Sequence, residues 1–318
     1  MAIEKHLFKI MRPTFISILF CVTALYFFGC RKAIELDPSA GGTKWKKVFR
    51  EPSIDIFFNS PQNGAALTTS RLINTANGGL EWSYFSDSIN SGVNIGVGSD
   101  TTLCVVGENK IQFSYGTNKT IKTYLLNETI FDCLYIDRNT CILNGEKNIW
   151  ITRNSGRSIE RVLRTDSLST QAIGAFKTIA RITNNRFWVA RASGNLFETK
   201  DKGVTWNKIN LRYNGLTTIQ MLSEQLGFYA DSSGLYKTVD GGLSWRSLKN
   251  DVKDLHFFNA NLGYVTNESD EILKTVDGGL TWSTVFYLEN VRVIEMFFLD
   301  ENNGWVSTLS GIYKLAAP

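Results

Sequence analysis

From residue 43 onward, short apolar runs follow one another along the chain, each ended by turn-forming residues. After residue 245, this pattern predicts a short outer strand and then strands at 254–258, 263–266 and 272–275. A turn rich in Asn and Gly separates the first two of these. Four short strands within a repeat of about forty residues are typical of a β-propeller blade.

An eight-residue motif, here called the box, recurs near the end of each repeat. Its clearest copies are TVDGGLTW at 275–282, TVDGGLSW at 238–245 and TKDKGVTW at 199–206. In such a turn, a short Asp side chain accepts backbone hydrogen bonds, Gly allows a positive φ, and Trp supplies a large buried anchor. We therefore expect structural roles, not catalysis, for Thr199, Asp201, Gly203, Trp206, Thr238, Asp240, Gly242, Trp245, Thr275, Asp277, Gly279 and Trp282.

Weaker copies of the box extend the repeat towards the N-terminus. They lie at 75–82 and 152–159, each with Asn in place of Asp, at 114–121, and as a tail ending at Trp45. The box-end positions are then 45, 82, 121, 159, 206, 245 and 282, with spacings of 37, 39, 38, 47, 39 and 37. This spacing predicts an all-β, seven-bladed propeller with four-stranded antiparallel blades. The last repeat lacks an outer strand, so we expect the N-terminal strand at 43–49 to complete it and close the ring.

The box resembles the Asp-box, or bacterial neuraminidase repeat. The longer period, for example LHFFNANLGYVTNESDEILKTVDGGLTW, resembles that of photosystem II stability/assembly factor-like β-propellers over roughly residues 43 to 318. The resemblance implies a scaffold that holds a membrane-protein partner during assembly. Because boxes of this type occur in enzymes and in binding proteins, the motif indicates architecture and not activity.

The N-terminus has the features of a secretory signal. Lys5, Lys9 and Arg12 precede an uncharged apolar run of 16 residues, and Gly29 and Cys30 follow. This arrangement resembles a bacterial lipobox, although Phe27 stands where Leu is usual. The predicted organisation is a signal peptide at 1–29, a lipidated Cys30 with a tether at 30–42, and the propeller at 43–318. An uncleaved anchor or an ordinary signal peptide are the alternatives to an extracytoplasmic lipoprotein of the outer membrane or periplasm.

Composition excludes several classes of chemistry. The net charge of +4 is mild, and no basic stretch interleaved with aromatic residues predicts nucleic-acid binding. No phosphate-binding Gly motif occurs, and His256 is the only histidine after the signal, so we expect no cofactor and no metal. Among the cysteines, Cys133 and Cys141 flank a short turn and could pair; buried free thiols, with Cys104, are the alternative.

Enzymatic candidates are few. The stretch 49–52, FREP, only partly matches the sialidase pattern, and it falls on the predicted outer closing strand. Glu198 and Glu295 are candidate glycosidase carboxylates, but nothing in the sequence pairs them. We therefore expect a non-enzymatic protein-binding or assembly scaffold that acts as a monomer. A polysaccharide-binding or glycoside-hydrolase-like propeller is the alternative.

A group of arginines is the candidate partner-binding site. The four arginines recur at intervals of four, four and three, at Arg153, Arg157, Arg161 and Arg164. On strands, this spacing would place the first three on one side and form a basic ridge. The long spacing of 47 adds about nine residues within 161–177, and loops carry function on rigid scaffolds. The alternative is a solvated outer face with no partner.

Overall fold

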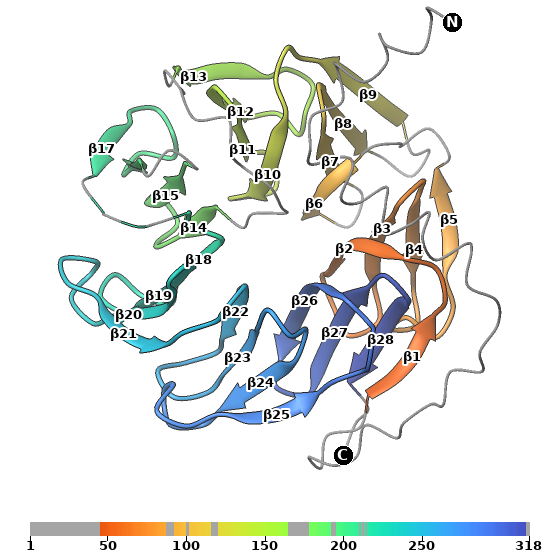
Figure 1. Cartoon of the computed structure of the whole chain (residues 1–318). Coiled ribbons are helices and arrows are strands. Elements are labelled where there is room, and N and C mark those ends of the chain that lie inside the picture. Colours follow the sequence, from red (N-terminus) through yellow and green to blue (C-terminus); the bar gives the residue numbers. More distant parts are fainter. Residues whose placement is uncertain are drawn as a thin grey trace, which may run out of the picture. The chain divides into compact units, whose positions relative to one another are not determined.

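The computed structural model describes residues 45–86, 92–99, 102–115, 120–164, 178–191, 195–209, 211, 213 and 215–315. In these residues, no helix is long and apolar enough to cross a membrane. The strands form seven four-stranded antiparallel sheets, as the spacing of the boxes predicts. Figure 1 shows them as blades arranged around a centre.

Each blade begins with an inner strand and adds a second strand beside it. The inner strands are β2 (Ser53–Phe58), β6 (Gly92–Ser99), β10 (Ile130–Tyr135), β14 (Ile179–Arg181), β18 (Thr218–Met221), β22 (Asp254–Phe257) and β26 (Val293–Asp300). The second strands are β3 (Gly64–Thr68), β7 (Thr102–Gly107), β11 (Cys141–Gly145), β15 (Phe187–Ala190), β19 (Gly227–Asp231), β23 (Gly263–Thr266) and β27 (Asn303–Thr308). The strands predicted after residue 245 are thereby confirmed.

The third and outer strands complete each blade, and the box forms the turn between them where it is fully described. The third strands are β4 (Leu72–Thr75), β8 (Lys110–Tyr115), β12 (Asn148–Thr152), β16 (Leu196–Thr199), β20 (Gly234–Thr238), β24 (Ile272–Thr275) and β28 (Gly311–Leu315). The outer strands are β5 (Ser83–Ser86), β9 (Thr120–Leu125), β13 (Glu160–Arg164), β17 (Asn207–Ile209), β21 (Arg246–Lys249), β25 (Ser283–Phe286) and β1 (Trp45–Phe49). Blades 1 to 6 start at β2, β6, β10, β14, β18 and β22, and blade 7 starts at β26.

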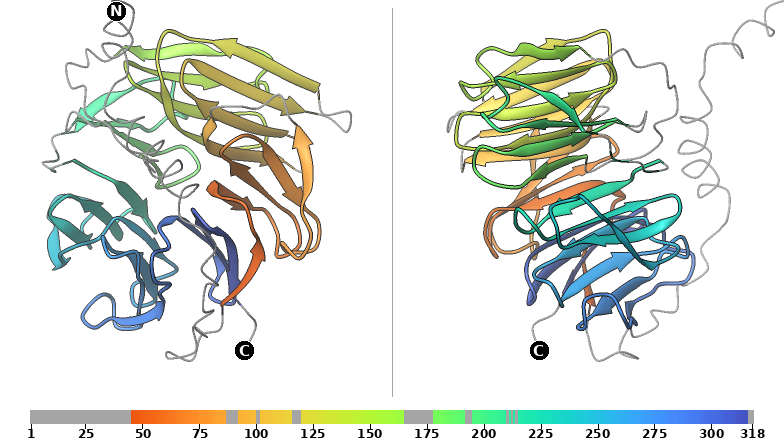
Figure 2. Two further views of the ribbon diagram at one scale, coloured as in Figure 1. Left: turned by 45° about the vertical axis from the view of Figure 1, so that its right-hand side comes forward. Right: turned by 90° about the vertical axis from the view of Figure 1, so that its left-hand side faces the viewer.

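The N-terminal strand closes the ring, as predicted. β1 pairs antiparallel with β28 in blade 7, with Trp45 opposite Leu315. Inner strands of successive blades contact one another in order from β2 to β26, and β26 contacts β2. The two views of Figure 2 show the blades side by side around this circuit. Closure leaves blade 7 with its full set of four strands, because the chain supplies them from both of its ends.

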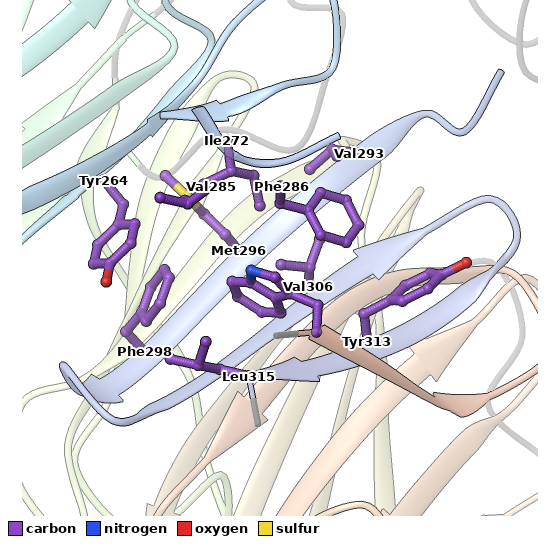
Figure 3. Packing of buried hydrophobic residues seen from close by; sticks show 11 residues of the cluster. Tyr264, Ile272, Val285, Phe286, Val293, Met296, Phe298, Val306, Tyr313 and Leu315 are labelled. Carbon is purple, nitrogen blue, oxygen red and sulfur yellow. The ribbon is translucent and has the colours of Figure 1, made fainter. Parts of the chain in front are cut away.

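The hydrophobic core lies between neighbouring blades. Between blades 6 and 7, Trp45 packs edge-on against Phe286 and Phe298, with ring centroids 5.4 Å and 6.2 Å away. Figure 3 shows the same cluster, in which Tyr264 and Phe298 lie side by side. Their rings stack at 4.4 Å. Aromatic burial of this kind is a large hydrophobic contribution, so each blade is stabilised mainly by the next one.

Glycine makes room for these aromatic rings. Gly263 starts β23 beside Phe257, and a Cβ on Gly263 would stand 2.3 Å from the Phe257 ring. That distance is impossible for real atoms, so the close approach of ring and backbone requires Gly there. Phe257 in turn stacks on Phe228 of the preceding blade at 3.6 Å. The Gly therefore belongs to the packing between blades and not only to the turn before it.

Polar side chains tie several inner strands together. In β2, β6 and β10, a bulge precedes Asp55, Asn94 and Asp132, respectively. Asp55 Oδ2 accepts the Ile95 N–H of blade 2 at 2.6 Å, and Asn94 Oδ1 accepts the Cys133 N–H of blade 3 at 3.2 Å. These acceptors satisfy N–H groups on the free edges of the inner strands, which would otherwise lack partners.

Asp132 makes the same connection from blade 3 to blade 4. Its Oδ2 accepts the N–H groups of Thr178 and Ile179, at 2.7 Å and 2.9 Å. The side chain is buried, and burial, followed by the nearby Cys133, raises its pKa to about 7. The connection between these two blades therefore contains a titratable group.

Candidate partner-binding site

The box is a turn held together by its own side chains. In blade 6, Thr275 Oγ1 donates to Asp277 Oδ1 at 2.8 Å and accepts the Gly279 N–H at 2.9 Å. Asp277 then accepts the Thr281 N–H at 2.9 Å and the Thr281 hydroxyl at 2.5 Å. The bond from the Thr281 hydroxyl is the main cause that holds the pKa of Asp277 at about 2. Every oxygen of the carboxylate is engaged inside the turn, which is a structural role.

The boxes with Asn keep the same geometry. In blade 3, Asn154 Oδ1 accepts the Ser158 N–H at 2.8 Å, and Thr152 Oγ1 accepts the Gly156 N–H at 2.8 Å. An amide oxygen therefore replaces the carboxylate oxygen as the acceptor of the turn. The equivalent contact in blade 1, from the Glu81 N–H to Asn77, is 2.9 Å. The negative charge is therefore not required to form the box.

The fifth residue of the box needs Gly. Gly79, Gly156, Gly203, Gly242 and Gly279 all have φ between 80° and 92°. The fourth residue of the same five boxes also has a positive φ. Its N–H donates to a backbone carbonyl oxygen in the loop between the first two strands of its own blade. These fourth residues are Gly78, Ser155, Lys202, Gly241 and Gly278. Each of these boxes is therefore fixed to its own blade, and its second and sixth residues project from the surface.

The four candidate arginines lie at one edge of blade 3, but not all on strands. Arg153 and Arg157 are the second and sixth residues of the box turn, whereas Arg161 and Arg164 lie on the outer strand β13. The strand spacing expected for the first three was therefore wrong, because the turn interrupts it. All four are exposed. The added residues after Arg164, up to residue 177, lie outside the described residues.

Neighbouring blades add two lysines that sequence spacing did not indicate. The ammonium group of Lys122, in blade 2, donates a hydrogen bond to the backbone carbonyl oxygen of Arg157. The backbone carbonyl oxygen of Lys202, in the box of blade 4, accepts a hydrogen bond from Arg153 Nη1 at 3.0 Å. Lys202 holds the fourth position of its box, and Lys122 directly follows the end of the box copy at 114–121. Aligning the repeats on their boxes would therefore have indicated both lysines.

Acidic residues offset part of this positive charge. Glu160 forms an ion pair with Arg153 at 3.0 Å, and Asp137 lies 3.5 Å from Lys202. Such exposed pairs contribute little to stability. The basic cluster, defined as Arg153, Arg157, Arg161, Arg164, Lys122 and Lys202, therefore offers contacts suited to an acidic partner.

The candidate glycosidase carboxylates are on different blades. Glu198 lies on β16 of blade 4, and Glu295 lies buried on the inner strand β26 of blade 7. Glu198 accepts hydrogen bonds from Arg186 and Trp188, at 2.5 Å and 3.1 Å. Burial would raise the pKa of Glu198, but these bonds outweigh it and the pKa lies below its ordinary value. A carboxyl group in that state is poorly suited to act as a general acid.

The remaining candidate groups are packed into the fold. His256 lies against Phe258 and Phe298, with centroid distances of 4.8 Å and 5.5 Å. Cys104, Cys133 and Cys141 are buried free thiols, so the alternative of a pair between the last two is not realised. The proposed lipid site Cys30 lies outside the described residues.

Comparison with known proteins places the fold. No protein-family model matches the sequence, and no curated protein matches it. Among solved structures, YCF48 bound to a D1 peptide has a TM-score of 0.67 and 14% identity, over 90% of this chain and 97% of that one. A streptogramin B lyase has a TM-score of 0.69 and 12% identity, over 87% and 98%. These likenesses show that the chain is a β-propeller.

An enzyme has the same fold over part of its length. A xyloglucanase from Xanthomonas campestris has a TM-score of 0.67 and 14% identity, over 85% of this chain and 53% of that one. The chain thus spans about half of the xyloglucanase chain. Binding proteins and enzymes both share this architecture, so the fold by itself does not select an activity.

Proposed function

We propose that this chain is a non-enzymatic propeller that binds a protein partner and acts as an assembly scaffold at a membrane. In this proposal, lipidation at Cys30 anchors it outside the cytoplasm, and the basic cluster of blade 3 contacts the partner. The observation that carries the proposal is the meeting of Arg153 and Arg157 with Lys122 of blade 2 and Lys202 of blade 4 at one box. Arg161 and Arg164 continue the positive charge along the outer strand β13 that follows this box. The peptide bound to the structurally similar YCF48 supports protein binding.

The test is retention of a partner from solubilised membranes. The lipidated full chain serves as bait, beside a variant with Arg153→Ala, Arg157→Ala, Arg161→Ala and Arg164→Ala. A matched control variant removes exposed basic residues from the outer strands of blades 4, 5 and 7: Lys208→Ala, Arg246→Ala and Lys46→Ala. We expect one membrane protein to be retained by the wild type and the control and lost from the arginine variant, since contacts at charged rims depend on local complementarity.

A second candidate function is polysaccharide binding or cleavage, which the similarity to a xyloglucanase favours. It requires two carboxyl groups on either side of a sugar, whereas Glu198 is ion-paired with Arg186 on the third strand of blade 4 and Glu295 lies buried on the inner strand of blade 7. A glycan array with the same bait separates the two functions. Retention on glycans together with no membrane protein retained would reject the scaffold function.

A further inference from the structure

The exposed positions of the boxes differ systematically from blade to blade. Positions two and six are Arg153 and Arg157 in blade 3, and Lys200 and Val204 in blade 4. In blades 5 and 6 all four are apolar, and we call them the apolar tips: Val239, Leu243, Val276 and Leu280. The row therefore changes from basic through mixed to apolar.

The apolar tips are exposed side chains outside the core. Their exposed fractions are 70% for Val239, 90% for Leu243, 67% for Val276 and 65% for Leu280. Single exposed apolar residues are ordinary, but here two pairs stand at equivalent positions in the boxes of adjacent blades. In these boxes the N–H groups of the fifth and seventh residues already donate to the Thr and Asp side chains of the turn. A partner could therefore cover the tips without leaving these polar groups unpaired.

The boxes of blades 3 to 6 follow one another in chain order, and we call this row the rim; each box from blade 4 to blade 6 contacts the preceding blade. Arg153 of one box donates to the Lys202 carbonyl of the next. The box of blade 5 contacts blade 4, since a Cβ on Gly242 would stand 2.7 Å from the Trp188 ring. The box of blade 6 contacts blade 5, since a Cβ on Gly279 would stand 2.8 Å from Leu248 Cδ1 on the outer strand β21.

We propose that this rim docks one amphipathic segment of a partner protein, with acidic residues facing Arg153 and Arg157 and apolar residues covering the apolar tips. The inference rests on the protein-binding function proposed above and adds the chemistry of the segment. The order of side chains along the rim favours such a segment, because a segment lying along the rim would meet cations at one end and methyl groups at the other.

A membrane surface fits the rim less well. Asp240 and Asp277 lie in the same turns as the apolar tips, and Asp201 lies in the box of blade 4; hydrogen bonds from Ser244, Thr281 and Thr205, respectively, hold their pKa values at about 2. The two negative charges beside the apolar tips oppose contact with anionic lipid. A protein segment can cover the methyl groups and leave these carboxylates in water at its edge.

The test uses labelled synthetic peptides and fluorescence anisotropy with the full chain. Two probes carry a block of Asp and Glu joined to a block of Leu and Val, one with the acidic block first and one with it last. A third probe has the same composition in scrambled order. The tip variant is Val239→Ser, Leu243→Ser, Val276→Ser and Leu280→Ser, and the control variant is Leu125→Ser and Tyr287→Ser, which are also exposed apolar residues elsewhere.

We expect one block peptide to bind, the tip variant to weaken that binding by about tenfold or more, and the control variant to leave it unchanged. Added salt should weaken wild-type binding more than binding by the variant Arg153→Ala and Arg157→Ala. No binding of either block peptide, equal binding of the scrambled peptide, or no effect of the tip variant overturns the proposal.

Two further outcomes would show that something other than a partner segment binds the apolar tips, and both would also overturn the proposal. These are tip-dependent binding to vesicles of phosphatidylglycerol and phosphatidylethanolamine without peptide binding, and tip-dependent self-association in sedimentation without peptide binding. The membrane retention experiment distinguishes the two proposals. If the tip variant retains the partner as well as the wild type does, the scaffold function is supported and the docking surface is rejected. If peptide binding depends on the tips but no membrane protein is retained, the docking surface is supported and the scaffold function is rejected.

Discussion

The indole N–H of Trp305 donates to the carbonyl oxygen of Gly78 at 3.1 Å, across 227 positions of sequence. Trp305 lies on β27 of blade 7, and Gly78 lies in the box of blade 1. The same Trp ring stacks on Phe58 of blade 1 at 3.6 Å. One buried side chain therefore contributes both packing and a hydrogen bond to the closure of the ring.

Replacing Trp305 with Phe should destabilise the propeller through this bond. Trp305→Phe leaves the Gly78 carbonyl without its indole donor, and losing a partner of a buried group costs about 1–3 kcal/mol in addition to the lost ring volume. Trp45→Phe is the matched control, because Trp45 is also buried and no hydrogen-bond partner of its Nε1 occurs among the described residues. Urea unfolding measures both free energies of unfolding. Equal losses in the two variants would contradict a specific role for the bond.

Stability in acid should depend on the boxes with Asp. The folded pKa of Asp201, Asp240 and Asp277 is about 2, below the ordinary value of 3.8. Their contribution is therefore present above pH 3.8 and is lost as the pH falls towards the folded value. A variant with Asn at all three positions keeps the acceptor oxygens, as Asn77 and Asn154 do. We expect it to be less stable than wild type at pH 7, with a difference that shrinks in acid; a constant difference across urea titrations would contradict this.

Asp132 should have the opposite pH dependence. Burial raises its folded pKa from 3.8 to about 7, so the folded state binds the extra proton between those values. The associated stabilisation is present below pH 3.8 and is lost as the pH rises to the folded value. Asp132→Asn removes this titration. We therefore expect the free energy of unfolding of the variant, minus that of wild type, to increase as the pH rises from 4 to 8. Asp132→Ala, which offers no acceptor to Thr178 and Ile179, should be destabilised throughout; an Asn profile parallel to wild type would reject the assignment.

The three described cysteines should be inert in the folded protein. Cys104 and Cys141 are fully buried and Cys133 nearly so. Burial raises the pKa of the Cys104 and Cys133 thiols well above their ordinary value, whereas at Cys141 burial is outweighed by hydrogen bonds with those two thiols, which lower the pKa to about 6. Because a reagent cannot reach a buried sulfur atom in either protonation state, we expect iodoacetamide to modify these thiols only in concentrated guanidinium chloride. Peptide mass spectrometry locates the labels. A cross-linked peptide containing Cys133 and Cys141 would show that the pair forms in the protein as isolated.

The sequence by itself determined the architecture of this protein. The box ends at Trp206, Trp245 and Trp282 each fall immediately before an outer strand, at Asn207, Arg246 and Ser283. The missing outer strand of the last repeat likewise predicted its replacement by β1. This was possible because the side-chain hydrogen bonds that shape a box join residues at most four positions apart, so the turn can be recognised from a short stretch of sequence.

Only the tertiary structure decided which side chains from different blades meet. Asp55 accepts a bond from Ile95 forty positions away, and Lys122 contacts Arg157 from the neighbouring blade. The expected ridge of arginines failed for a local reason, because Arg153 and Arg157 lie in the box turn at 152–159 that the sequence already indicated. Contacts between blades depend on how two sheets pack against each other, and that packing follows from side-chain volumes on both faces and not from the spacing of residues along one strand.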